Sequence, residues 1–321
     1  MNKTIIPIII IVLIVGAFFI INSLSEVSPQ IIENALSKIS EYDSYNTKGE
    51  LGVKITSQEE DQIDIDLSFT QKVDQSNKEE VKSLSDFNLS IGSEGATLQA
   101  DFQTITISQD TYLKIIEAPL IPMLMGLNLE SLENQWYKIN QEEIYGTIEG
   151  DEETTEGKNI LEEIKKIIEG KSFFKVKKNL GIEELDGQET TCYLLELNKK
   201  TIKETIPEFL NVIKKYISEE RRREYEEEIS KKLEEAYQKF DDFWKRVEPM
   251  EIKMWIDDLT QIRKISFEKE LDLTEDSQIK KIDILFETTF SQFNEKLDIE
   301  APDNYKNLEE AVSNLVPISL E

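Results

Sequence analysis

Residues that could carry out chemistry are few in this sequence, and none is placed for catalysis. Histidine is absent, which excludes Ser-His-Asp triads, histidine general-base catalysis and zinc sites that need histidine. Asp64 and Asp66 form a carboxylate pair, but strand alternation puts both on the water-facing side. Ser93, in the tetrapeptide of residues 92–95, lacks the Gly-x-Ser-x-Gly spacing of a nucleophile elbow. We therefore expect a protein that is not an enzyme and that needs no cofactor.

Cys192 is the only cysteine, so an intrachain disulfide is excluded. It begins the apolar run CYLLEL, which favours a buried, inert thiol over an intermolecular bridge. The same run is apolar on both faces, as in a central strand or a strand beneath a helix.

The chain of 321 residues carries 37 basic and 65 acidic side chains, a net charge of −28. Nucleic acid is a poor partner for such a chain, because phosphate binding depends on clustered Lys and Arg. Residues 141–158 are acidic and contain three glycines, and we interpret them as an exposed loop. They lack the spacing of a calcium-binding EF-hand loop, and no metal site is expected.

A binding role for apolar side chains is the alternative to catalysis. Residues 118–129 (APLIPMLMGLNL) contain two prolines and two methionines and are not strand-like. They could plug the apolar face of a sheet, or form an adaptable lid over a ligand cavity, since methionine fits varied shapes. We predict that the ligand-lining residues, if there is a cavity, include Leu67, Phe69, Phe87, Leu89, Met123 and Met125; packing in an ordinary core is the other interpretation.

The elements that position these residues are antiparallel strands. Apolar and polar residues alternate through residues 51–55, 63–70, 87–91 and 96–102, separated by short turns. The phase then changes, with Ile105 and Ile107 continuing on odd numbers, and we expect a bulge near residues 103–104 to restore the facing. Further strands are expected at 112–116, 135–139, 173–197, 252–290 and 297–299.

Helices are expected at four places. Ser28 and Pro29 are typical of a helix start, and an apolar face follows through Ile31, Ile32, Ala35, Leu36 and Ile39. Shorter helices are predicted at 159–169 and 305–315. Residues 201–248 form the longest helical pattern, either two helices or one bent helix, with Pro207 in an early turn and a charged, solvated middle at 218–232.

An uncharged apolar run, residues 5–21, lies at the N-terminus. Its length is at the short end for a membrane-spanning helix and exceeds the usual core of a cleaved signal peptide. Lys3 precedes the run, which predicts an N-terminus inside and a domain outside. We favour a single-pass anchor at the cell membrane, with residues 1–25 as anchor or signal and 26–321 as the extracytoplasmic domain. Cleavage after Ser25, which would release a secreted protein, is the alternative.

Several local strings resemble those of bacterial LolA/LppX-like envelope proteins. They are the strand WYKI at 136–139, the hairpin GIEELDGQETTCY at 181–193, the hairpin WIDDLTQIRK at 255–264 and the closing segment 290–302. The resemblance covers about residues 29–302. It implies an α+β fold in which a curved antiparallel half-barrel has helices against its concave face, around a hydrophobic cavity for lipids or lipoproteins. This chain lacks the lipidated cysteine of many relatives, and 201–248 is interpreted as a charged helical insertion.

Two functions remain open from the sequence. The first is a membrane-anchored, non-catalytic protein that binds or carries an apolar ligand, a lipid or a lipidated protein, in the half-barrel cavity. The second is an envelope or surface module with a fully packed core that binds a protein partner, with the charged insertion as the candidate binding surface. An unfilled apolar face would favour the first function.

Overall fold

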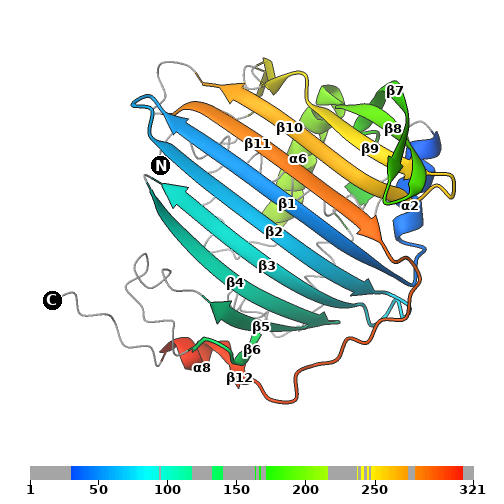
Figure 1. Ribbon diagram of the computed structural model, residues 1–321. Helices are drawn as coiled ribbons and strands as arrows, with labels where there is room; N and C mark the ends of the chain where they lie inside the picture. Colours follow the sequence, from blue (N-terminus) through cyan, green and yellow to red (C-terminus); the bar gives the residue numbers. More distant parts are fainter. Residues whose placement is uncertain are drawn as a thin grey trace. The chain divides into compact units, whose positions relative to one another are not determined.

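A computed structural model describes residues 30–93, 95–117, 132–139, 163, 166–167, 171–215, 237, 240–241, 244–245, 247–273 and 279–313. Contacts divide the chain into two compact units. The first unit comprises residues 1–41 and 147–263, and the second comprises 42–146 and 264–321. Each is described by itself, and Figure 1 labels their elements.

The second unit is a curved, open sheet in which nearly all neighbours are antiparallel (Figure 1). The strand order is β12-β6-β5-β4-β3-β2-β1-β11-β10. The strands are β1 (Ser44–Ser57), β2 (Gln62–Asp74), β3 (Lys82–Ser93), β4 (Ala96–Ile107), β5 (Asp110–Glu117), β6 (Trp136–Ile139), β10 (Ile262–Asp272, whose first two residues belong to the first unit), β11 (Ile279–Ser291) and β12 (Lys306–Asn307). Among the strands named here, β12 alone pairs in parallel, with β6, and an isolated parallel bridge joins Ile115 to Glu133. The predicted hairpins from β1 to β5 are thus confirmed, with longer strands than the patterns suggested.

Two chemically different faces result from the period-two alternation of these strands. In β2 the odd-numbered residues from Ile63 to Val73 share one face, and directly opposed residues of neighbouring strands lie on the same side. We call this side the apolar face, and the opposite side the charged face. The apolar face carries Leu51, Val53 and Ile55 from β1, Ile65, Leu67 and Phe69 from β2, Phe87, Leu89 and Ile91 from β3, Leu98, Ala100 and Phe102 from β4, and Ile282, Ile284 and Phe286 from β11.

Gly49 of β1 makes room for an aromatic ring on this face. It lies directly opposite Phe69. A Cβ added to Gly49 would stand 2.5 Å from Cζ of Phe69 and 2.8 Å from the carbonyl oxygen of Glu287. The ring therefore occupies the space that any other residue at position 49 would need.

The predicted bulge near residues 103–104 is wrong. The β3–β4 register runs without a shift from Ser93↔Ala96 to Lys82↔Ile107, so Ile105 and Ile107 lie on the charged face. There Ile105 packs with Tyr112 and Ile299 in a second, smaller core, together with the partly buried Leu84, Ile107, Trp136 and Leu297. A shift does occur between Asp101 and Phe102, but in the pairing of β4 with β5.

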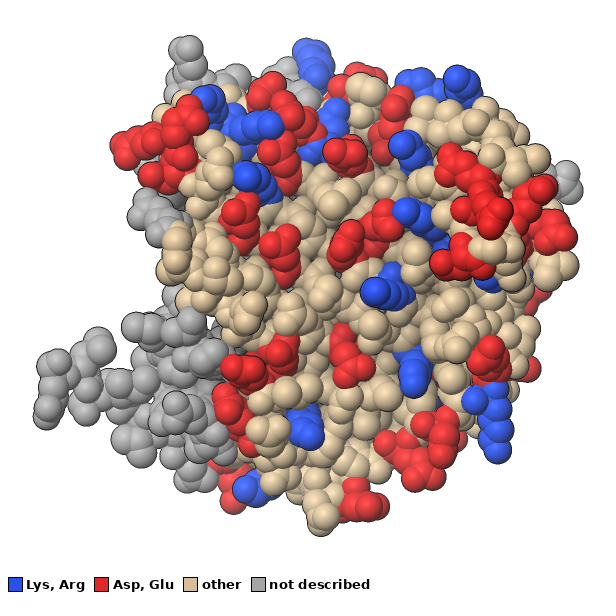
Figure 2. All heavy atoms as spheres, in the orientation of Figure 1, with Lys and Arg blue, Asp and Glu red and all other residues tan. Residues whose placement is uncertain are grey.

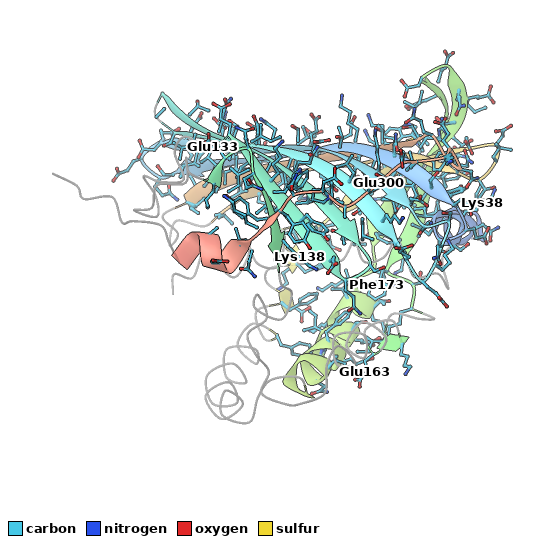
Figure 3. All side chains as sticks on the ribbon, turned by 90° about the horizontal axis from the view of Figure 1, so that it is seen from below. Lys38, Glu133, Lys138, Glu163, Phe173 and Glu300 are labelled. Carbon is cyan, nitrogen blue, oxygen red and sulfur yellow. The ribbon has the colours of Figure 1, made fainter. Side chains whose placement is uncertain are left out.

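The C-terminal segment explains this second core. Residues 292–305 form no strand, which corrects the prediction of one at 297–299. Instead Leu297 and Ile299 pack against the apolar side chains that β3, β4 and β5 place on the charged face. Figure 3 shows the segment, marked by Glu300, leading into α8 (Leu308–Ser313). The helix predicted at 305–315 is confirmed in this shorter form, and residues 314–321 lie outside the described part.

The first unit contains a three-stranded antiparallel arrangement in the order β9-β8-β7. The strands are β7 (Phe174–Leu185), β8 (Gln188–Leu197) and β9 (Glu251–Asp257). Its helix α2 (Gln30–Ile39) buries Ile32, Ala35, Leu36 and Ile39 as predicted, whereas Ile31 is exposed. Ser28 and Pro29 lie outside the described residues, as does most of the helix predicted at 159–169.

Helix α6 (Lys199–Lys215) begins two residues before the predicted start, and Pro207 stands in its middle and not in an early turn. Residues 216–236 are outside the described part, so the charged middle is untested. Beyond it, the described residues at 237, 240–241, 244–245 and 247 are helical. Phe240 and Trp244 are buried and stacked, with ring centroids 5.5 Å apart.

Asp241 joins this helical segment to α6. Its carboxylate is hydrogen-bonded to Lys203 and lies 2.9 Å from Nζ of Lys199. The hydrogen bonds from Lys203 and Lys199 lower the pKa of Asp241 to about 2. Because this pKa is depressed, the interaction of Asp241 with Lys203 and Lys199 stabilises the folded state at any pH above the ordinary pKa of an aspartate. The stabilisation is lost as the pH falls toward 2.

Replacing Gly49 by alanine should destabilise the protein by about 1–3 kcal/mol, because Phe69 and the β11 backbone cannot both retreat. Gly52→Ala is the matched control on the charged face of the same strand, where the nearest atom is 3.4 Å from the added Cβ. Urea unfolding should show a change of less than about 0.5 kcal/mol for this control. Equal effects of the two substitutions would contradict the close approach of Phe69.

Ile299→Ala should release the C-terminal segment, at a cost of about 2–5 kcal/mol for a buried isoleucine. Hydrogen exchange at the amides of residues 306 and 307 should become faster, since Ile299 helps to hold the segment that leads into β12. Asp298→Ala, at an exposed neighbouring position, should leave both exchange and stability unchanged. Unaltered exchange in Ile299→Ala would refute the second core.

Asp241→Asn should lower the melting temperature at pH 6, where the ion pair with Lys203 and Lys199 is intact. The difference from the wild type should shrink between pH 4 and pH 2 as Asp241 is protonated, since its pKa is about 2. Thermal melts of both proteins across this range provide the measurement. A difference that stays constant down to pH 2 would argue against the ion pair.

Candidate ligand-binding face

Four of the six predicted lining residues lie together on the apolar face. Leu67 and Phe69 are in β2, and they lie directly opposite Leu89 and Phe87 of β3. Met123 and Met125 are outside the described residues, as are all of residues 118–129, so neither a lid nor a plug is tested. A ligand-lining role for the six residues stays a prediction.

An aromatic row crosses three strands of this face. The rings of Phe69 and Phe87 have centroids 6.4 Å apart, and those of Phe87 and Phe102 are stacked at 4.9 Å. Phe102 was not among the predicted lining residues. Its position could have been found by counting outward from the pair of Ser93 and Ala96, which puts Phe102 opposite Phe87.

Burial varies strongly across the apolar face. Over β10 and β11 the side chains of Ile265, Leu271, Ile282, Ile284 and Phe286 are buried. Over β2, β3 and β4 the neighbouring apolar side chains are mostly half-buried: Ile65, Leu67, Phe87, Leu89, Ile91, Leu98 and Phe102. Ile63 is 41% exposed. Apolar surface thus remains accessible over these three strands. A fully packed core would have buried these side chains.

Over β1 to β5 and β11, charges are segregated from this face, whereas Lys269 of the neighbouring β10 lies on it, opposite Ile284. At the paired positions of β1 to β5 and β11, every Asp, Glu, Lys and Arg lies on the charged face. Ion pairs there include Lys54–Asp64 at 3.8 Å and Lys264–Glu287 at 2.7 Å. Figure 2 shows side chains of both signs interspersed over the side of the sheet that faces the reader. Such exposed pairs add little stability and keep this side wet.

Two tyrosines at the border of the apolar face have raised pKa values, as expected in surroundings of low polarity. Tyr45 of β1 lies on this face, with its ring centroid 6.3 Å from that of Phe290. Burial raises the pKa of Tyr45, because the charged phenolate would be poorly solvated there. Burial likewise raises the pKa of Tyr137 in β6, which packs with Leu132 and the α8 residues Leu308 and Ala311.

The residues considered for catalysis are not brought together. Asp64 and Asp66 lie on the charged face, as the alternation predicted. Cys192 is fully buried in β8, the middle one of the three strands of the first unit, and forms no disulfide, which confirms the expected burial of the thiol. In the described part of the chain, no group of three or more His, Cys, Asp or Glu is placed to hold a metal ion.

One side-chain hydrogen bond connects the two hairpin strings in the first unit. Asp186 and Gly187 both have positive φ and form the tight turn between β7 and β8. Nε1 of Trp255 donates to Oε2 of Glu183 at 2.7 Å. Oδ1 of Asp257 accepts from the backbone N–H groups of Leu259 and Gln261 at 3.0 and 2.8 Å. Asp186 and Asp257 thus build turns, and Glu183 holds the indole of Trp255.

Helices long and apolar enough to cross a membrane are not found among the residues described here. The run at 5–21 lies outside that part of the chain, as do the acidic residues 141–158. The anchor therefore remains an expectation.

A scan against protein-family models and a search of curated proteins find no match. Among solved structures, LprF from Mycobacterium bovis matches with a TM-score of 0.36 and 10% identity over 85% of this chain and 95% of that chain. The lipoprotein LppX from Mycobacterium tuberculosis matches with a TM-score of 0.35 and 12% identity over 84% and 97%. A DUF1329 family protein from Desulfovibrio piger matches with a TM-score of 0.23 and 8% identity over 88% and 98%. TM-scores below 0.5 and identities of at most 12% establish neither a family nor a ligand for this chain.

Proposed function

We propose that this protein is a membrane-anchored, extracytoplasmic and non-catalytic protein that binds or carries an apolar ligand, a lipid or a lipidated protein. The apolar face of the second unit would be one wall of the binding cavity, as in a half-barrel. Residues 5–21 would hold the protein at the membrane, with the N-terminus inside.

The accessible apolar surface over β2, β3 and β4 is the observation that carries this proposal. Seven neighbouring apolar side chains there are half-buried, although water is unfavourable for each of them. Contiguous apolar surface that a fold does not bury commonly marks an interaction site. A bound acyl chain would complete the burial that the fold leaves unfinished.

The shape of this surface fits a lipid better than a compact ligand. Along β2 the apolar face extends from Ile63 to Phe69, about 20 Å at the rise of a strand. A single leaflet of a bilayer has a hydrocarbon thickness of roughly 15 Å, so an extended acyl chain fits along this length.

A protein-binding module is the second candidate, favoured by exposed apolar side chains in the first unit. Ile182 of β7 and Leu259 in the turn after β9 are 66% and 60% exposed. These are single side chains on a strand and a turn, and they offer less apolar surface than the second unit does.

Photocrosslinking of the full-length chain in bacterial membranes tests the proposal. Cells grown on a diazirine-bearing fatty acid would be irradiated, and adducts located by peptide mass spectrometry. We expect adducts on β2, β3 and β4, several-fold fewer in Leu67→Gln, and no change in Ser68→Gln, which alters the charged face. Adducts confined to residues 1–29 in a folded protein would overturn the binding function and favour the protein-binding module.

A further inference from the structure

Strand β7 of the first unit has one edge that pairs with no other strand in the described part of the chain. It is the last strand in the sheet order, after β8 (Figure 1). It is twelve residues long, and residues 177–180 and 182–184 are all exposed. The strand at the other end of the order, β12, has only two residues. Within the described residues, β7 is thus the one long strand with an open edge.

The centre of β7 directs backbone hydrogen-bonding groups away from β8. At the end of β8, the N–H of Leu197 donates to the residue before β9, and the N–H of Asn198 donates to the residue before β7. By the alternation of antiparallel pairs, odd-numbered residues of β8 bond toward β9 and even-numbered ones toward β7. Asn179 and Ile182 lie opposite residues 193 and 191, which are odd-numbered. Their own N–H and C=O groups therefore point outward, where a further strand can bond to them.

A bulge at the centre of β7 changes which residues share a face. The register with β8 shifts after Asn179, so that Leu180 is an extra residue. In a regular strand, residues three or five apart lie on opposite faces. Here Asn179 and Ile182 share one face, and Lys178 and Glu183 share the other. Residues equally far from the midpoint of segment 178–183 thus match in facing, as antiparallel pairing of the segment with a copy of itself requires.

The charges of β7 are divided between its two halves. Lys175, Lys177 and Lys178 are in the first half, and Glu183 and Glu184 are in the second. Parallel pairing of two copies would put like charges opposite each other, which is unfavourable, whereas antiparallel pairing puts lysines opposite glutamates. The net charge of −28 makes copies of this chain repel each other in general. Strand β7 is therefore a place where the local charges favour the approach of a second copy.

We propose that β7 pairs antiparallel with β7 of a second copy, about a twofold axis between Leu180 and Gly181, to form a homodimer. Asn179 then lies opposite Ile182 of the second copy, and Lys178 lies opposite Glu183. Ile182, which is 66% exposed in the single chain, is partly covered by the added strand. Beside the axis, a Cβ added to Gly181 would meet no atom within 4 Å. Leu180 of the second copy, 38% exposed in the single chain, occupies this space.

The same geometry limits the assembly to two copies. A contact about a twofold axis uses the same surface in both partners, and each partner has spent its open edge once the pair is formed. A second register shift follows Val176, so that regular pairing is confined to the centre of the strand. The dimer involves no residue of the apolar face, and the inference is therefore independent of ligand binding.

Sedimentation equilibrium of the full-length chain in detergent tests the proposal, and we expect a monomer–dimer equilibrium. Lys178→Glu and Glu183→Lys should each raise the dissociation constant roughly tenfold or more, because like charges then face each other at two places. In an equimolar mixture, positions 178 and 183 carry glutamate in one copy and lysine in the other. The mixture should therefore recover the wild-type dissociation constant within about threefold. A misfolded variant could not show this recovery.

Lys253→Glu is the matched control for the charge reversal. Lys253 of β9 is exposed and lies in the row of Lys178, on the same face, but two strands inside the edge. The substitution changes the net charge equally and should leave the dimer unchanged. A chain that stays monomeric throughout the concentration range would overturn the proposal. So would a dimer that both β7 variants retain, that mixing does not restore, or that Lys253→Glu weakens to the same extent.

Disulfide formation between two differently tagged variants, Asn179→Cys and Ile182→Cys, tests the register. Directly opposed positions have Cα atoms about 5.5 Å apart, within reach of a disulfide, whereas identical positions are offset by three residues, or about 10 Å along the strand. Mild oxidation of the mixture should therefore give several-fold more linked dimer than oxidation of either variant alone. The native Cys192 is fully buried and should not compete. Equal linking in all three samples would contradict the proposed pairing.

Discussion

The second unit depends on a pairing register that runs without a slip from β1 through β2 and β3 to β4. Because side chains alternate with period two, a slip of one residue would exchange the apolar face with the charged face in every strand beyond it. Gly49 and Phe69 help to fix this register. The ring of Phe69 fits over a backbone position without Cβ, and no other position in β1 on that face offers the same space.

The unbroken register has two results. It aligns Phe69, Phe87 and Phe102 in one row and Thr47, Gln71, Ser85 and Thr104 in the next, although these residues come from four strands. It also puts Ile105 on the charged face, where it would be exposed without the C-terminal segment. The sheet thus has two unequal apolar regions. The small one is covered by Ile299 from the same chain, and the larger one over β2 to β4 is only partly covered.

Much of this architecture could be predicted from alternation alone. Residues 63–70 gave the strand, its two faces and the place of Asp64 and Asp66, because a strand's period is set by backbone geometry. Ile105 was predicted on the wrong face because the prediction assumed that the sheet has a single apolar face. A bulge near residues 103–104 was the smallest change that would put Ile105 on that face. Only the distant Leu297 and Ile299 reveal the second core. The row of Thr47, Ser85 and Thr104 could not be predicted for the same reason, since these residues are aligned only when three pairing registers are known. The strings that resemble those of LolA/LppX-like proteins were informative about turns, as Asp186 and Asp257 show.

The outer edge of the second unit bears on how copies of this chain would meet. A long unpaired strand offers its backbone N–H and C=O groups to a neighbouring molecule and so invites endless addition. Here the strands shorten toward that edge, from twelve residues in β4 to eight in β5 and four in β6. The two residues of β12 then cover part of what remains, in parallel orientation. Such an edge offers few backbone partners to a second copy. A protein with a large apolar surface can in this way keep that surface accessible without polymerising through its sheet.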